Sequence, residues 1–177
     1  VWVSVFTAIS AFCNAGFDLF GRFGAYSSLV PYVNNYYVQA VIMFMIMAGG
    51  LGFMVWVELA EYRKKRRLSL HAKVVLQFSA IFWVGGAVLL ALLEWSNPRT
   101  MGGLSVPGKI MAALFQSVST RTAGMNTIDL AACSPISKLL MSVLQFIGAA
   151  PGSTGGGVKV TTFAVLILTI RSVAQGR

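Results

Sequence analysis

Charged residues are scarce in this sequence, and acidic residues are the scarcest of them. Only 11% of the 177 residues are charged, with five acids against fourteen bases and a formal net charge of +9. Hydrophobic residues make up 56% of the chain. Soluble globular domains carry about 25% charged residues. The composition therefore argues against a soluble domain and indicates a membrane protein.

Cysteine and histidine are almost absent as well. The two cysteines, Cys13 and Cys133, are too few for a disulfide framework and match no metal-ligand spacing. We expect both to be unpaired thiols. The single histidine, His71, falls in a polar stretch where a solvated side chain is the simplest interpretation. We therefore expect no cofactor bound to this chain and no metal held by its side chains.

Long apolar runs are abundant by contrast. Residues 38–57 and 74–93 each form a run of twenty residues with very few polar members. A helix of about that length spans a hydrocarbon core of about 30 Å. A chain of this size cannot bury two such helices on all sides within a soluble core. We therefore predict two membrane-spanning helices.

The largest basic cluster, YRKKRR at residues 62–67, lies between the two runs. Cytoplasmic loops of membrane proteins collect Lys and Arg, so we place residues 61–73 on the cytoplasmic side. A basic block in this position more often sets the orientation of the neighbouring helices than binds a polyanion. No nucleic-acid partner is predicted.

Two shorter apolar segments, residues 1–12 and 106–118, are typical of buried or re-entrant helices. For the second, Ser105 is a plausible N-cap and Pro107 suits the first helical position. The first segment opens the sequence at Val1, without a methionine or a signal peptide. We therefore interpret the sequence as a piece of a longer protein.

A small polar sequence follows each short segment, FCNAGFD at residues 12–18 and TRTAGMN at residues 120–126. A shift of 108 positions places Gly16 on Gly124, which indicates an internal repeat. Backbone carbonyls at membrane depth are tolerated where they line a water-filled path or are buried in protein. We predict that the two loops form an ion filter, in which glycine lets carbonyl oxygens face a monovalent cation. The alternative is a re-entrant hairpin used only for packing.

Three motifs carry a family resemblance: AISAFCNAGFDLFG, FQSVSTRTAGMNTIDL and GAAPGSTGGGVKVTTFAVL. Together they resemble the pore subunit of the Trk/Ktr/HKT superfamily of potassium transporters, most closely its bacterial Ktr and Trk branch, over essentially the whole chain. The resemblance implies an all-α membrane protein in which repeated units of helix, re-entrant pore loop and helix surround a single pore. On that map residues 1–60 belong to the second repeat, residues 61–73 form the basic cytoplasmic loop and residues 74–177 belong to the third repeat.

The resemblance assigns K⁺ binding to backbone carbonyls of two segments. The first filter segment is Asn14, Ala15, Gly16 and Phe17, and the second is Thr122, Ala123, Gly124 and Met125. Met125 stands where family members usually have phenylalanine. Asp18 and Asp129 follow the two segments, where they either concentrate cations at the mouth or are simply solvated. Arg121 precedes the second segment, and we expect it to hydrogen-bond loop carbonyls or an acid, because a bare cation there would oppose conduction.

The glycine-rich stretch at residues 148–162 resembles a phosphate-binding loop only superficially. Val158 separates Gly157 from Lys159, and no preceding strand or metal-binding acid is expected. Residues 136–148 and 160–171 would form helices of about 20 Å and about 18 Å, each too short to span the membrane alone. Pro151 and the glycines break the helix between them, which places the break near the middle of the bilayer.

The resemblance supports a movable loop at this break that obstructs the path below the filter, with small residues providing mobility. The gate segment comprises Pro151, Gly152, Ser153, Thr154, Gly155, Gly156, Gly157 and Lys159. Lys159 is an ionisable residue at membrane depth. It either helps to hold the loop closed, repels cations, or is satisfied by neighbouring carbonyls.

These features predict the pore-forming subunit of a potassium uptake system, with K⁺ as the transported ion and no enzymatic chemistry. The resemblance implies a multi-pass protein of the cell membrane, in bacteria the inner membrane. It also implies a homodimer that rests on a cytosolic ring of nucleotide-binding regulatory subunits, with the basic loop facing that ring or anionic membrane lipid. The alternative is a secondary transporter whose broken helices bind another small solute at the membrane midplane.

Overall fold

The computed structural model describes residues 1–24 and 27–176, and this part of the chain is all-helical, as predicted. The α-helices are α1 (Trp2–Phe12), α2 (Tyr36–Gly50), α3 (Phe53–Lys65), α4 (Leu70–Glu94), α5 (Val106–Thr120), α6 (Pro135–Phe146) and α7 (Val160–Ala174). Two short 3-10 helices, η1 (Phe20–Phe23) and η2 (Val30–Tyr32), lie between α1 and α2. The described residues contain no strand, only an isolated bridge between Ile147 and Val158.

Helix α4 has the length and apolar composition needed to cross a membrane, as predicted from residues 74–93. It begins earlier than predicted because the Ser69 hydroxyl accepts a hydrogen bond from the backbone N–H of Ala72 at 3.1 Å. Glu58 in turn accepts hydrogen bonds from the backbone N–H and the hydroxyl of Ser69. Only residues 66–69 therefore connect α3 to α4, and His71 lies in the first turn of α4.

The prediction of one straight helix over residues 38–57 was wrong. This run is divided between α2 and α3, whose axes meet at 99°. Gly52 lies at the break with φ +83°, a conformation that residues with a side chain rarely adopt. A Cβ atom on Gly52 would also lie 2.5 Å from the carbonyl oxygen of Pro151. The glycine allows the bend, and the residues at the bend contact Pro151 and Gly152 of the gate segment.

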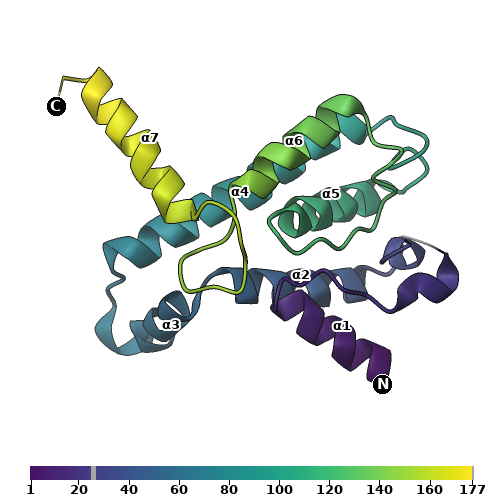
Figure 1. The fold of residues 1–177 in the computed structure, drawn as a ribbon, viewed down its shortest axis with the longest axis horizontal. Coiled ribbons are helices and arrows are strands. Elements are labelled where there is room, and N and C mark those ends of the chain that lie inside the picture. The colour runs from purple at the N-terminus through teal and green to yellow at the C-terminus, as the bar shows by residue number, and fades with distance from the viewer. Residues whose placement is uncertain (25–26, 177) are drawn as a thin grey trace.

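More than half of the residues of helix α5 are buried. It packs against α2, α4 and α6 (Figure 1), and its Ala112, Ala113 and Phe115 are fully buried. The capping serine was predicted correctly, since the Ser105 hydroxyl accepts from the backbone N–H of Gly108 at 3.3 Å. The helix begins at Val106, so Pro107 is its second residue. Helices α1 and α2 form a second packed pair, and α7 projects away from the rest (Figure 1).

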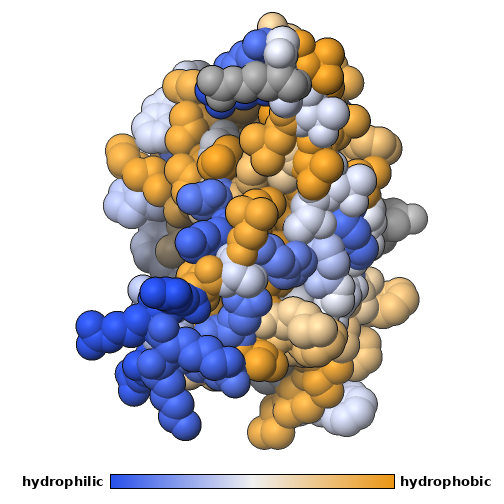
Figure 2. Space-filling view, turned by 90° about the vertical axis from the view of Figure 1, so that its left-hand side faces the viewer, coloured by the Kyte–Doolittle hydropathy of each residue, from blue (hydrophilic) through white to orange (hydrophobic). Residues whose placement is uncertain are grey.

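Apolar side chains remain exposed on the outer helices. On α7, Val165, Leu166 and Ile170 each expose more than half of their surface. Figure 2 looks onto the end of the molecule that carries α3 and α7, where hydrophilic side chains gather at one lower corner and apolar side chains cover much of the rest. Lipid or further helices could cover such apolar faces without burying an unpaired polar group.

Candidate ion filter and gate

The two filter segments, far apart in the sequence, meet in the structure. Each follows the C-terminus of a short helix, α1 for the first segment and α5 for the second. A Cβ atom on Gly16 would lie 2.7 Å from the carbonyl oxygen of Ala123 and 3.5 Å from the Cα atom of Gly124. Only glycine at position 16 permits this approach. The sequence repeat thus corresponds to two loops in direct contact.

The two segments share one backbone conformation. Asn14 and Gly16 have φ of 50° and 74°, and the residues 108 positions later, Thr122 and Gly124, have φ of 83° and 79°. Asparagine and glycine tolerate this left-handed region, whereas a β-branched threonine rarely adopts it. Left-handed residues at alternate positions allow successive carbonyl groups to face one side of the chain, which is the arrangement that a carbonyl filter requires.

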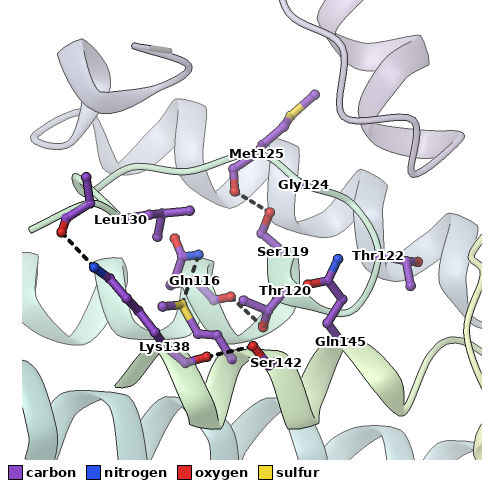
Figure 3. Close-up of a pocket in the computed structure, with 12 residues that line it drawn as sticks. Gln116, Ser119, Thr120, Thr122, Gly124, Met125, Leu130, Lys138, Ser142 and Gln145 are labelled. Carbon is purple, nitrogen blue, oxygen red and sulfur yellow. Dashed lines mark hydrogen bonds between the residues drawn. The ribbon is translucent and has the colours of Figure 1, made fainter. Parts of the chain in front are cut away.

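A serine of the preceding helix holds the outer end of each segment. The Ser10 hydroxyl donates to the carbonyl oxygen of Phe17 at 2.6 Å. The Ser119 hydroxyl donates to the carbonyl oxygen of Met125 (Figure 3). Backbone N–H groups of Ala15 and Gly124 also donate to the carbonyls of these two serines, at 2.9 Å and 3.2 Å. The carbonyls of Phe17 and Met125 are thus engaged within the protein.

The side chains after the two glycines have different surroundings. Phe17 exposes 69% of its surface, whereas Met125 is only 1% exposed and packs with Phe115 and Val118. The Met125 side chain therefore fills a core position, while its backbone carbonyl accepts the Ser119 hydroxyl. Methionine is well suited to this role because its flexible thioether fills irregular space.

Arg121 is buried between the second filter segment and the glycine-rich break. Its Nη2 atom donates to the carbonyl oxygen of Gly148 at 2.6 Å, as the sequence led us to expect for a loop carbonyl. Its guanidinium also lies 5.5 Å and 5.7 Å from the ring centroids of Phe82 and Trp83 on α4. Over the described residues no carboxylate pairs with it. The charge is therefore stabilised by a carbonyl and two aromatic faces.

The acids after the filter segments close local turns. Asp18 accepts a hydrogen bond from the backbone N–H of Phe20, and Asp129 accepts one from that of Ala131, each at 2.9 Å. Side chains of Asp commonly bond the backbone two residues on in this way. Each acid thus has a local turn contact in addition to the two roles considered from the sequence.

The gate segment lies within a compact loop, residues 147–159, whose two ends pair with each other. The backbone N–H of Gly148 donates to Val158 at 2.9 Å, and that of Ala149 donates to Gly156 at 3.2 Å. A Cβ atom on Gly148 would overlap the Gly156 carbonyl, and Gly157 has φ +75°. We expected the glycines to provide mobility. In this conformation they serve close backbone packing and a left-handed turn.

The gate segment docks onto the break between α2 and α3. Two backbone hydrogen bonds join them, from Thr154 N to Gly49 O at 3.2 Å and from Phe53 N to Gly152 O at 3.1 Å, and the preceding residue adds a third, from Ala150 N to Gly50 O at 3.0 Å. The contact is formed by the GGLGF motif at residues 49–53, which was not singled out as a contact site from the sequence. Its signal was three glycines in four residues within an apolar run.

Lys159 is satisfied locally. Its Nζ atom donates to the carbonyl oxygen of Gly155 at 2.7 Å, and the side chain is half-buried. Of the three roles considered for this residue, this contact corresponds to satisfaction by a neighbouring carbonyl. It also holds the end of the gate segment to its middle.

A cavity of about 510 Å³ lies beside the second filter segment, between α5 and α6 (Figure 3). Thr122 and Gly124 line it together with polar residues of the two helices, Gln116, Ser142 and Gln145. The Oε1 atom of Gln116 and the hydroxyl of Thr122 are buried, and neither has a hydrogen-bond partner among the described residues. Unlike the close-packed loops around it, this region can therefore accept water or polar groups.

Glu94 is a buried residue that the sequence reasoning did not single out. It is fully buried at the end of α4 and accepts hydrogen bonds from the backbone N–H of Ser134 and the hydroxyl of Ser137. Asn97 and Thr100 donate to its other oxygen. These bonds attach the start of α6 to the end of α4. The signal was an acid placed directly after an apolar run and before a polar cluster.

Comparison with known proteins places this geometry among cation transporters. The family model of TrkH, described as a cation transport protein, matches residues 1–177. The chain is 37% identical over its full length to the potassium/sodium uptake protein NtpJ of Enterococcus hirae, covering 38% of that protein. It is 41% identical over 95% of its length to the Ktr system potassium uptake protein B of Vibrio alginolyticus, covering 36% of that protein.

A solved structure shares the fold. The potassium transporter TrkH from Vibrio parahaemolyticus matches 95% of this chain with a TM-score of 0.73 and 22% sequence identity. The chain corresponds to 35% of that transporter. It therefore spans well under half the length of the solved structure and of the curated relatives named above.

Proposed function

This chain belongs to the TrkH family of cation transport proteins and lies in the cell membrane, and on that premise we propose that it forms part of the K⁺ pathway of a potassium uptake system. The observation that carries the proposal is the contact between the two filter segments at Gly16 and Gly124, with the gate segment packed against them. The relatives' names, which specify potassium or potassium and sodium, support K⁺ as the transported ion.

The filter carbonyls in this proposal are those of residues 14–16 and 122–124. Their backbone alternates through left-handed conformations at Asn14, Gly16, Thr122 and Gly124. The next carbonyls along, of Phe17 and Met125, accept serine hydroxyls. Carbonyl oxygens replace the hydration shell of a monovalent cation without a charged ligand. No covalent step is needed, and ions move down their electrochemical gradient.

The gate segment obstructs this path in the proposal. Its contacts with the break between α2 and α3 are backbone hydrogen bonds, each of which contributes about 0.5–1.5 kcal/mol net. A loop held by a few such bonds opens and closes with a small change in free energy. The structure represents the closed arrangement in this view.

Deletion of residues 152–157 from the full-length protein tests the gate. We expect K⁺ uptake velocity to rise several-fold in potassium-starved cells, because the obstruction and its backbone contacts are lost. The measurement is initial uptake in a strain that lacks its own potassium uptake systems, normalised to the amount of protein in the membrane. Gly156→Ala, which keeps the length of the loop and adds a Cβ atom where nothing lies within 4 Å, serves as the control.

An unchanged uptake velocity in the deletion variant, with normal membrane abundance, would falsify the gate assignment. Failure of the unaltered full-length protein to rescue growth at low K⁺ would instead remove potassium uptake itself from the proposal. Rescue by another solute would favour the secondary transporter. The two parts of the proposal are thus tested separately.

The proposed assembly follows the family. We propose a homodimer of full-length subunits on a cytosolic ring of nucleotide-binding regulatory subunits. The end of α3 carries Arg63, Lys64 and Lys65 and is followed by Arg66 and Arg67. Apart from the Lys65–Glu61 pair, no ion pair is recorded among the described residues, which leaves these bases available to acidic groups of the ring or of anionic lipid.

A further inference from the structure

We propose that the Thr154 hydroxyl is a latch between the gate segment and the first filter segment, so that opening the gate changes K⁺ selectivity as well as flux. The inference rests on the proposed function, since it needs both a filter and a gate. It adds a specific residue pair, Thr154 and Asn14. It also adds a consequence that a separate filter and gate would not have, namely that opening the gate changes selectivity.

The latch consists of two hydrogen bonds made by one hydroxyl. The Thr154 Oγ1 atom accepts from the side-chain amide of Asn14 at 2.8 Å and donates to the carbonyl oxygen of Phe12 at 2.8 Å. Both its acceptor and its donor capacity are therefore used. The contact joins the gate segment to a filter residue 140 positions earlier in the chain.

Helix α2 closes the junction from a third side. The backbone N–H of Thr154 donates to the carbonyl oxygen of Gly49 at 3.2 Å. A Cβ atom on Gly49 would overlap the Phe12 carbonyl and would lie 2.7 Å from Thr154 Oγ1. Glycine at position 49 therefore lets the end of α1, the end of α2 and the gate segment converge on the threonine hydroxyl.

Displacement of the gate segment would change the first filter segment directly. Asn14 holds a left-handed conformation, with φ 50°, while Thr154 accepts its amide. The Phe12 carbonyl is one of the last carbonyls of α1, which have no partner within the helix. When Thr154 leaves, both groups lose a partner at the base of the filter. The backbone of residues 14–16 is then less constrained.

The second filter segment lacks an equivalent latch. Arg121 attaches to Gly148, at the root of the break, and the Thr122 hydroxyl has no hydrogen-bond partner among the described residues. The coupling is therefore asymmetric. Gate movement breaks a side-chain hydrogen bond of Asn14, whereas no side chain of the second filter segment is seen to hydrogen-bond the gate segment among the described residues.

Three variants of the full-length protein test the latch in proteoliposomes. Thr154→Val keeps the shape and removes the hydroxyl, Thr154→Ser restores the hydroxyl, and Ser153→Ala removes a neighbouring hydroxyl that donates within the loop to Ala150 at 2.5 Å. Loss of two neutral hydrogen bonds shifts an open–closed equilibrium by about tenfold. We expect Thr154→Val to raise K⁺ flux by about that factor and to lower the K⁺/Na⁺ permeability ratio. Thr154→Ser should stay near wild type.

A double variant checks that the two residues act together. Asn14→Gly keeps the left-handed backbone and removes the amide. Residues in contact give non-additive effects, so Asn14→Gly with Thr154→Val should change selectivity little more than either single change. Ser153→Ala should leave selectivity unchanged whatever it does to flux. If Thr154→Val does not accumulate in the membrane, Thr154→Ala replaces it.

The outcomes separate the latch from the gate. Raised flux with unaltered selectivity in Thr154→Val overturns the coupling and leaves the gate standing. Wild-type flux in Thr154→Val, alongside raised flux on deletion of residues 152–157, overturns the latch alone. If that deletion has no effect either, the proposed gate fails and the latch fails with it. Additive effects of the Asn14 and Thr154 changes also overturn the latch.

Discussion

Arg121 carries a charge in a place where bulk water hardly reaches it. It is 5% exposed, and its stabilisation comes from the Gly148 carbonyl and the faces of Phe82 and Trp83. A planar guanidinium suits this site, because it can donate a hydrogen bond in its plane while aromatic rings contact its faces. The residue joins the C-terminal end of α5 to Gly148, where the glycine-rich loop begins. Its role in this structure is to position the two elements.

Replacement of Arg121 should therefore reduce stability. Arg121→Met leaves the Gly148 carbonyl without its donor, and hydrogen bonds to charged groups contribute about 1.5–3 kcal/mol. We expect a lower unfolding midpoint in detergent. Arg121→Lys should be intermediate, because lysine keeps a donor and loses the planar stacking. Arg99→Met, at an exposed position, is the control. Altered conduction without any loss of stability would argue against a positioning role.

The two broken helices form an interlocked pair. Two helical segments are interrupted, one at Leu51–Gly52 and the other at residues 147–159. The interruptions dock on each other through three backbone hydrogen bonds. Backbone groups freed by a helix break need partners within the membrane, and here each break supplies them for the other. The bend between α2 and α3 and the folded conformation of residues 147–159 are thus held by the same hydrogen bonds.

Gly52→Ala tests this interdependence. The added Cβ would lie 2.5 Å from the Pro151 carbonyl, and alanine is disfavoured at φ +83°. We expect the gate segment to be displaced, with K⁺ flux raised in the same direction as by the loop deletion and stability lowered by about 1–3 kcal/mol. Gly85→Ala on α4 is the matched control, because nothing lies within 4 Å of its Cβ position. Equal behaviour of the two variants would show that the breaks do not depend on each other.

The glycines of the two filter segments differ in their surroundings, which predicts that substitutions at the two positions have unequal effects. Both Gly16 and Gly124 have positive φ, with values of 74° and 79°. A Cβ on Gly16 would meet the Ala123 carbonyl at 2.7 Å, whereas the nearest atom to a Cβ on Gly124 lies at 3.5 Å. A side chain at position 16 would therefore clash with the Ala123 carbonyl and would also be strained by the positive φ, whereas a side chain at position 124 would be subject to the strain alone.

In the full-length protein, Gly16→Ser should lower K⁺/Na⁺ selectivity and K⁺-dependent growth more than Gly124→Ser. Both variants strain the backbone, at a cost of about 1–3 kcal/mol for an unfavourable φ, and only the first also forces the two segments apart. The measurement is uptake of K⁺ and Na⁺ at matched membrane abundance. Gly103→Ser, which has open space around its Cβ position, is the control. A greater loss at Gly124 would contradict the packing between the segments.

Much of the fold could be predicted from local sequence, whereas the filter and gate roles stay predictions. Apolar run lengths and capping residues predicted α1, α4, α5, α6 and α7 to within a few residues. The 108-residue repeat identified two loops that prove to be neighbours. The bend at Gly52 and the hydrogen bonds of Glu94 escaped prediction, because each depends on a partner far away in the chain.

Sequence by itself determined that this is a helical membrane chain with two glycine-bearing loops and one interrupted helix. Hydropathy and helix propensity are properties of neighbouring residues, so they can be recognised without a fold. Only the tertiary structure decided what the glycines do. Gly16, Gly49 and Gly52 each make room for a backbone carbonyl from another segment. Such approaches depend on how distant segments pack, and no local pattern specifies them.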